Sequence, residues 1–300
     1  MTLVLTACGA TSTPAPIGSA SGSGLILMSL RDGTQLGAAA VGSDPVAVIT
    51  SSDGHVAFVA DSSPGDVYAV TIPALTVMWR QHVGGSPFGL LLHGSRLLVS
   101  LFAAGSVLEL DPTSGARVAS HDVPAGPSVM AVDGMGRVLV AARSGRLAYL
   151  DGTSVDAGKG FAVAAAGRDV WTADYAASEL VRVRDGHRLK LPDPVHPFWV
   201  ATGVPGHLLI AAEGADEDAD QGRVYQLDLA TERFTTLATP RDPDQVLQSG
   251  SKVLIAAHGD GEVRVLEGSQ THVWARGAPA VALAIVPAME AALVVVNGHE

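Results

Sequence analysis

Polar and ionisable side chains recur at two kinds of position in this chain, and they are the residues with which it could do chemistry. One kind directly follows short apolar segments, most of which end in Ala, and the other precedes the next apolar segment, often beside a proline. These positions give ten candidate ligand-binding residues: Asp44, Asp61, Arg143, Asp174, Tyr175, His196, Glu213, Arg241, Asp242 and His258.

Imidazoles and carboxylates among these residues raise the question of a metal site, since such groups ligate zinc, iron or magnesium. The residues in question are His196, His258, His299, Glu213, Asp242 and Asp174. The alternative is that polar residues cap strand ends and bind one another or water. The sequence leaves both interpretations open.

Two arginines, Arg143 and Arg241, suit a carboxylate or phosphate, because a guanidinium can donate two parallel hydrogen bonds. The alternative for each is an ion pair with a neighbouring Asp or Glu. The four tryptophans lie in apolar segments, where we expect packing rather than a ligand platform.

An acidic loop contains Asp216, Asp218 and Asp220 at alternate positions, a spacing that lets three carboxylates converge on Ca²⁺. The match to an EF-hand loop is partial, because the sixth position is Gln221 and the twelfth is Leu227. We therefore expect weak calcium binding at most, with a solvated acidic loop as the alternative. Calcium is therefore a candidate cofactor, but the sequence establishes none.

Composition narrows the function classes further. The formal net charge of −11 over 300 residues argues against a nucleic-acid partner, which needs a basic surface. The single cysteine, Cys8, excludes an internal disulfide and a cysteine-based metal site. No nucleophile elbow, P-loop or His-Glu-Xaa-Xaa-His motif occurs, so the sequence predicts no catalytic residue.

A repeat of roughly forty residues must position these side chains. Each repeat has a short apolar strand opening near a proline, a tight turn, a second apolar strand, a loop and a third strand. The first strands open at Pro45, Pro87, Pro127, Ala162, Pro197, Pro243 and Pro279. Gly, Pro or Asp-Gly interrupts the apolar runs too often for helices.

The count of strands predicts how the ring closes. Seven first strands and seven second strands are found, but only six third strands follow them. The missing strand is the segment that begins at Leu25, so residues 25–40 supply the outer two strands of the seventh repeat. The sequence thus predicts an all-β, seven-bladed β-propeller of four-stranded blades, closed by the N-terminal segment and spanning 25–300 as a single domain.

The repeat resembles the YVTN-type propellers and, more loosely, the quinoprotein amine dehydrogenase-like group. The resemblance is carried by Asp44-Pro45-Val46-Ala47-Val48 with Ser52-Asp53-Gly54, and by the segment from Val107 to Gly115. It implies the fold, and it says little about function because propellers host enzymes, electron-transfer proteins and scaffolds.

The N-terminus suggests export. Leu5-Thr6-Ala7-Cys8 resembles the lipobox of bacterial lipoproteins, in which the cysteine is lipidated. Because the apolar stretch before it is shorter than the ~7–15 residues of a signal core, we expect 1–8 to be a truncated signal whose start lies upstream. Residues 9–24, almost wholly Gly, Ser, Thr, Ala and Pro, are expected to form a flexible tether.

Together these patterns favour a monomeric, extracytoplasmic, lipid-anchored protein of the cell envelope that acts as a binding or scaffold protein. Its partner is an unknown protein or small molecule, and it meets the membrane only through the anchor. The alternative is a metal-dependent enzyme similar to the streptogramin lyases or the gluconolactonase-like lactonases, with its site at the channel mouth.

Overall fold

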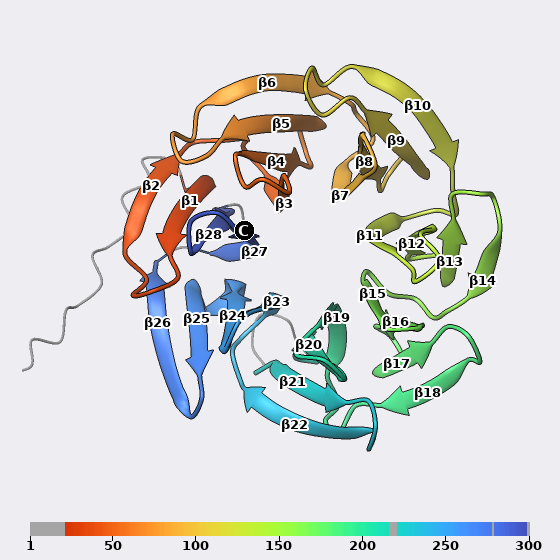
Figure 1. Cartoon of the computed structure of the whole chain (residues 1–300). Coiled ribbons are helices and arrows are strands. Elements are labelled where there is room, and N and C mark those ends of the chain that lie inside the picture. The colour runs from red at the N-terminus through yellow and green to blue at the C-terminus, as the bar shows by residue number, and fades with distance from the viewer. Residues whose placement is uncertain (1–21, 216–220, 278, 299–300) are drawn as a thin grey trace, which may run out of the picture.

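The computed structural model describes residues 22–215, 221–277 and 279–298, and the regular secondary structure of this part of the chain is almost entirely β (Figure 1). Its 28 strands form seven four-stranded antiparallel sheets, arranged as blades of a ring around a central channel. Within the described residues one short 3-10 turn, His258–Asp260, is the only helical element, and none is long and apolar enough to cross a bilayer. The predicted seven-bladed β-propeller is confirmed.

Each blade runs outward from an innermost first strand. Blade 1 contains β3 (Pro45–Thr50), β4 (Val56–Asp61), β5 (Asp66–Thr71) and β6 (Val77–His82), and blade 2 contains β7 (Pro87–His93), β8 (Arg96–Leu101), β9 (Ser106–Leu110) and β10 (Arg117–Asp122). Blade 3 contains β11 (Pro127–Val132), β12 (Val138–Ala142), β13 (Arg146–Tyr149) and β14 (Ser154–Asp156), and blade 4 contains β15 (Val163–Ala166), β16 (Asp169–Asp174), β17 (Glu179–Arg182) and β18 (His187–Lys190). Blade 5 contains β19 (His196–Thr202), β20 (His207–Glu213), β21 (Arg223–Asp228) and β22 (Arg233–Ala238), and blade 6 contains β23 (Pro243–Ser249), β24 (Lys252–Ala257), β25 (Glu262–Glu267) and β26 (Gln270–Arg276). Blade 7 contains β27 (Ala280–Val286), β28 (Ala291–Val296), β1 (Gly24–Ser29) and β2 (Gln35–Ala39).

The hydrophobic core lies between the blades rather than within any one of them. Seven clusters of buried apolar side chains are present, one at each junction between neighbouring blades. Successive side chains of a strand point to opposite faces, so one inner strand serves two junctions. This is why the inner strands are continuous apolar runs instead of alternating ones.

The seam of the ring is closed by the N-terminal segment, as the strand count predicts. β1 pairs antiparallel with β28 over its whole length, from Gly24 opposite Val296 to Ser29 opposite Ala291. Leu25 and Leu27 pack toward blade 1, whereas Ile26 and Met28 pack toward blade 6. The two ends of the chain are thereby joined in one sheet, and β28 has no free edge.

Two blades depart from the regular pattern where the sequence signal weakens. The fourth strand of blade 3, β14, has only three residues, in the segment where no strand pattern is readable. β15, the first strand of blade 4, begins at Val163 without the proline of its counterparts.

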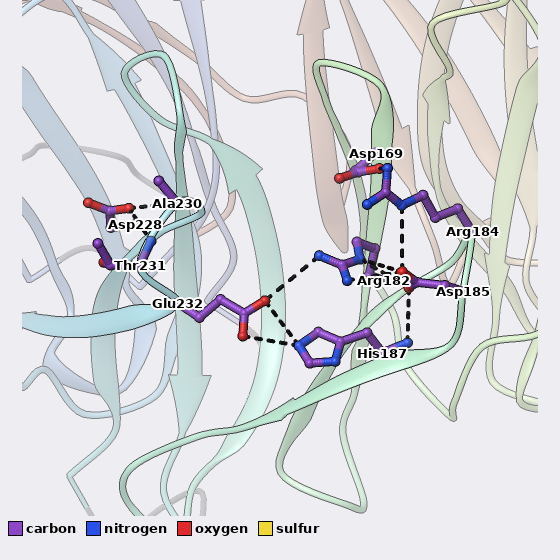
Figure 2. Close-up of polar contacts among 9 residues, drawn as sticks. All are labelled: Asp169, Arg182, Arg184, Asp185, His187, Asp228, Ala230, Thr231 and Glu232. Atoms are coloured by element: carbon purple, nitrogen blue, oxygen red, sulfur yellow. Dashed lines mark hydrogen bonds and ion pairs between the residues drawn. The ribbon is translucent and has the colours of Figure 1, made fainter.

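Charged side chains at the turns between third and fourth strands join blades 4 and 5 (Figure 2). In an antiparallel blade these turns lie on the face opposite the candidate residues. Arg182 of blade 4 forms ion pairs with Asp185 at 2.9 Å and with Glu232 of blade 5 at 3.7 Å. Glu232 also lies 3.1 Å from Nε2 of His187. The Arg182 guanidinium holds the pKa of the Asp185 carboxyl at about 2, below its ordinary value of 3.8.

We expect an NMR titration of the Asp185 side-chain carboxyl to give a midpoint of about 2. Because this pKa is lowered in the folded state, the carboxylate stabilises the fold above about pH 4, and the contribution is lost as the pH falls through about 2. Arg182→Gln should return the midpoint toward the ordinary value. A midpoint that does not respond to Arg182→Gln would show that another group depresses this pKa.

Candidate functional site

The candidate residues of the described chain lie in the loops that enter first strands and leave second strands, or at the adjoining strand ends. In antiparallel four-stranded blades both kinds of loop emerge on the same face of the ring. This face surrounds one mouth of the central channel, and we call it the loop face.

A β-bulge at the start of the inner strand positions side chains at this mouth. In every blade except blade 4, the inner strand gains one residue relative to its partner within the first few residues of the strand. A bulge re-aims a side chain away from the regular pleat. Four residues that directly follow the repeated proline therefore line the channel: Val46, Phe88, Phe198 and Asp244.

The channel behind the mouth is a cavity of about 520 Å³ with a mainly apolar wall. Two of its polar side chains are already hydrogen-bonded to backbone, because Thr50 donates to the Ile285 carbonyl and Gln245 accepts the Leu283 amide. Asp244 is the ionisable residue of the described wall. The volume lies within the range of small-molecule sites, roughly 300–1,000 Å³.

Aromatic side chains from blades 2, 4 and 5 meet beside this mouth, although they are far apart in sequence. The Phe161 ring centroid lies 4.8 Å from that of Phe198, 5.8 Å from Phe88, 6.4 Å from Phe102 and 6.0 Å from Tyr175. All five rings are half-buried, so each keeps part of its surface open. We call these five residues the aromatic rim, and Phe161 is its centre.

Backbone contacts hold Phe161 in place. A Cβ at Gly160 would lie 1.7 Å from the Ala173 carbonyl oxygen, so only glycine allows the loop to approach β16 this closely. The Phe161 carbonyl oxygen accepts hydrogen bonds from the Ser128 hydroxyl at 2.6 Å and the Val129 amide at 3.0 Å. The ring is therefore presented on a fixed backbone.

The two candidate arginines differ in their partners. Arg241 forms an ion pair with Asp260, and its Nε lies 3.1 Å from Oδ1 of that residue. This arrangement is the alternative to ligand binding that the sequence leaves open for this arginine. Arg143 instead lies over the rings of Phe161 and Tyr175, at 4.2 and 5.2 Å from their centroids. No carboxylate of the described residues forms an ion pair with it. Arg143 is thus a stacked guanidinium with its hydrogen-bond donors available to an anion.

Tyr175, His196 and Glu213 form one connected group at the edge of the rim. The His196 ring stacks on Tyr175 with centroids 4.7 Å apart, and its Nδ1 lies 2.8 Å from the Tyr175 carbonyl oxygen. Because a carbonyl only accepts, Nδ1 carries the proton. The Tyr175 hydroxyl donates to Glu213 Oε2 at 2.6 Å.

Three other candidate carboxylates have structural partners. Asp61 is 1% exposed and accepts the Asp44 amide at 2.6 Å, and burial raises the pKa of its carboxyl. Asp44 accepts the Asn297 side-chain amide at 2.7 Å, which ties blade 1 to blade 7. Asp174 accepts the Lys159 amide and pairs with Arg188. These contacts account for the three residues without a ligand.

A second cluster lies on the blade 6 side of the mouth and joins two candidates with a third residue. His258 Nδ1 lies 3.0 Å from Asp242 Oδ2 and 3.9 Å from Asp244 Oδ2. One ligand atom from each of these side chains lies within 4.8 Å of the others. His196 and Glu213 belong to the group around Tyr175, so the structure separates His196 from His258. His299 lies outside the described residues.

Sequence reasoning passes over four residues that the structure brings to the mouth: Phe88, Phe161, Phe198 and Asp244. Three of them occupy one repeat position, directly after the proline that opens a first strand. Superposing the repeats at that proline would have marked the position. Cys8, Asp216, Asp218 and Asp220 lie outside the described residues, and lipidation and calcium binding there stay predictions.

Comparison with known proteins places the chain by fold. No family model matches it, and neither does any curated protein. Three solved structures show the architecture. Hydrazine synthase of Kuenenia stuttgartiensis has a TM-score of 0.71 at 12% identity, over 84% of this chain and 92% of that one. Virginiamycin B lyase from Staphylococcus aureus has a TM-score of 0.67 at 10% identity, over 91% of this chain and 99% of that one. BamB from Moraxella catarrhalis has a TM-score of 0.56 at 17% identity, over 96% of this chain and 94% of that one. Likeness at these identities shows the β-propeller fold alone.

Proposed function

We propose that this protein binds a small molecule that combines an apolar or aromatic body with an anionic group. The observation that carries the proposal is the Arg143 guanidinium, which stacks on Phe161 and Tyr175 beside an apolar channel and forms no ion pair with a carboxylate of the described residues. Ring faces favour stacking with a planar or apolar body, and the guanidinium favours a carboxylate, sulfonate or phosphate.

The arrangement suits binding because its parts are held in place before a ligand arrives. The aromatic rim is fixed by ring–ring contacts and by the backbone bonds of Phe161, so little side-chain freedom is lost on association. The low-dielectric wall of the channel strengthens the attraction between Arg143 and an anion.

The protein's location is part of the proposal. Leu5-Thr6-Ala7-Cys8 and the tether after it support an extracytoplasmic lipoprotein of the cell envelope, anchored through Cys8. A monomer that meets the membrane only through this anchor would present the loop face to a soluble ligand or a protein partner. The negative net charge supports the exclusion of nucleic acid.

A metal-dependent lyase or lactonase is the second candidate function. The observation that favours it is the grouping of Asp242, Asp244 and His258 at the same mouth. The chain's lack of a recognised catalytic motif keeps binding as the first candidate.

Two fluorescent probes of matched shape test the role of Arg143. Anilinonaphthalene sulfonate carries an anion, and N-phenylnaphthylamine is the same ring system without it. Replacing a charge-assisted hydrogen bond costs about 1.5–3 kcal/mol, so Arg143→Gln should raise the dissociation constant of the anionic probe at least about 10-fold. Binding of the neutral probe should stay within about two-fold, because its ring contacts remain.

Arg241→Gln is the matched control, since Arg241 lies on the same face but is paired with Asp260. It should leave both dissociation constants unchanged. Equal effects of the two arginine substitutions on the anionic probe would contradict the proposal, as would a saturable site that does not distinguish the probes.

A further inference from the structure

Three side chains of blade 6 that are of metal-binding types lie close together, although they come from a loop, a β-bulge and a 3-10 turn. Asp242 ends the loop before β23 in a left-handed conformation, with φ of 41°. Asp244 occupies the bulge of β23. His258 opens the 3-10 turn after β24, and its amide donates to the Asp242 carbonyl at 3.0 Å. The same conformation as that of Asp242 occurs before the repeated proline of blade 2, where Ser86 has a φ of 54°, so it belongs to the geometry of this loop.

Their spacing fits one metal ion. Two ligands at metal distances of about 2.0–2.2 Å lie roughly 3.3–3.6 Å apart in a tetrahedral site. The observed separations from His258 Nδ1, 3.0 and 3.9 Å, lie on either side of that value. One ligand oxygen of each aspartate lies within 4.8 Å of the other, and metal binding would displace the proton between His258 Nδ1 and Asp242 Oδ2.

The donor set selects the kind of ion. One imidazole nitrogen with two carboxylate oxygens is typical of zinc and related divalent transition metals. Calcium and magnesium prefer all-oxygen sites, so His258 disfavours them. Among the first-row ions, zinc binds such donors more tightly than manganese or iron.

Nearby arginines are occupied by other acids. Arg241 and Arg264 both pair with Asp260, and Arg264 also contacts Glu262. Asp242 and Asp244 both face His258 from half-buried positions, and a divalent cation at this place would balance their negative charge.

We propose that Asp242, Asp244 and His258 form a binding site for a divalent transition-metal ion, zinc foremost, at the mouth of the channel. Three protein ligands leave at least one coordination position open, as in zinc sites that act on a ligand. Because Asp244 lines the channel, the three-residue cluster lies at the edge of the cavity. A metal there would hold an oxygen or nitrogen atom of whatever molecule enters.

Calorimetry with zinc chloride alone tests the site on the full chain after treatment with a chelator. We expect one saturable binding event, weakened at least about 10-fold by His258→Gln and by the isosteric Asp244→Asn. His121→Gln is the matched control, since His121 pairs with Glu109 and belongs to no three-ligand cluster among the described residues. Asp218→Ala should also leave zinc binding unchanged, which separates this site from the acidic loop.

A second measurement on the unmodified chain does not depend on the folding of any variant. Zinc should slow modification of His258 by diethyl pyrocarbonate, with the exposed His55 as an internal reference. The proposal is overturned by an absence of saturable zinc heat, by zinc binding that survives both site substitutions, or by loss of binding in Asp218→Ala. Since no organic ligand is present, none of these outcomes bears on the role of Arg143.

Discussion

Removal of residues 1–40 is expected to prevent formation of a stable propeller, whereas removal of residues 1–21 alone should leave the melting temperature nearly unchanged. The longer deletion removes β1, which lies between β28 and β2 in the seventh blade. It exposes the edge of β28 and opens two of the seven interblade cores. The shorter deletion removes mainly small and polar residues, which have little apolar surface to bury.

The size of the effect follows from four side chains. Leu25, Ile26, Leu27 and Met28 are each at most 2% exposed. Fully burying one such side chain contributes about 1.5–3 kcal/mol, so the four together contribute roughly 6–12 kcal/mol. The net stability of a folded protein is about 5–15 kcal/mol. The melting temperature should fall by at least about 12 °C, or the cooperative transition should disappear.

Thermal unfolding followed by circular dichroism compares the two truncations, and a peptide of residues 22–42 provides the control. Added in trans, the peptide should restore the transition, because its strand can pair again with β28. Equal melting temperatures for the two truncations would show that the N-terminal strand does not hold the ring closed.

Phe161→Ala should nearly abolish binding of both fluorescent probes. The ring is the centre of the aromatic rim and also the platform beneath Arg143, so its loss removes apolar contact and disturbs the anion site. Truncating a central aromatic residue of a binding site costs about 2 kcal/mol or more, which corresponds to a rise of roughly 30-fold in both dissociation constants. Alanine keeps the carbonyl that Ser128 and Val129 contact, so the loop should remain in place.

Phe234→Ala is the control for loss of an aromatic ring elsewhere. Phe234 packs against Tyr225 in the outer part of blade 5, away from the channel wall. It should lower stability without changing the affinity for either probe. If Phe161→Ala binds both probes as tightly as the unmodified chain, the aromatic rim is not the binding surface.

The ring and its closure were predictable because they depend on local patterns that repeat. Turn residues and apolar runs mark each strand, and the strand that begins at Leu25 completes the count. β14 was not predictable, because a strand of three residues at the outer edge of a blade is too short to show a periodic sequence pattern.

The candidate site was predictable only in part. The sequence locates the loop face, and with it Arg143, Tyr175 and His258, because loops at equivalent repeat positions meet at one end of a propeller. It does not show that Phe88 and Phe161 touch, since they come from different blades. It also does not distinguish Arg143 from Arg241, because the choice between an anion site and an ion pair depends on whether an acid such as Asp260 is within reach.

A crystal structure of the protein with anilinonaphthalene sulfonate would test the central claim most directly. The account predicts the naphthalene ring against Phe161 and Phe198 at the channel mouth, with the sulfonate hydrogen-bonded to the Arg143 guanidinium. A probe bound elsewhere on the propeller, or bound at the mouth with its sulfonate turned away from Arg143, would contradict it.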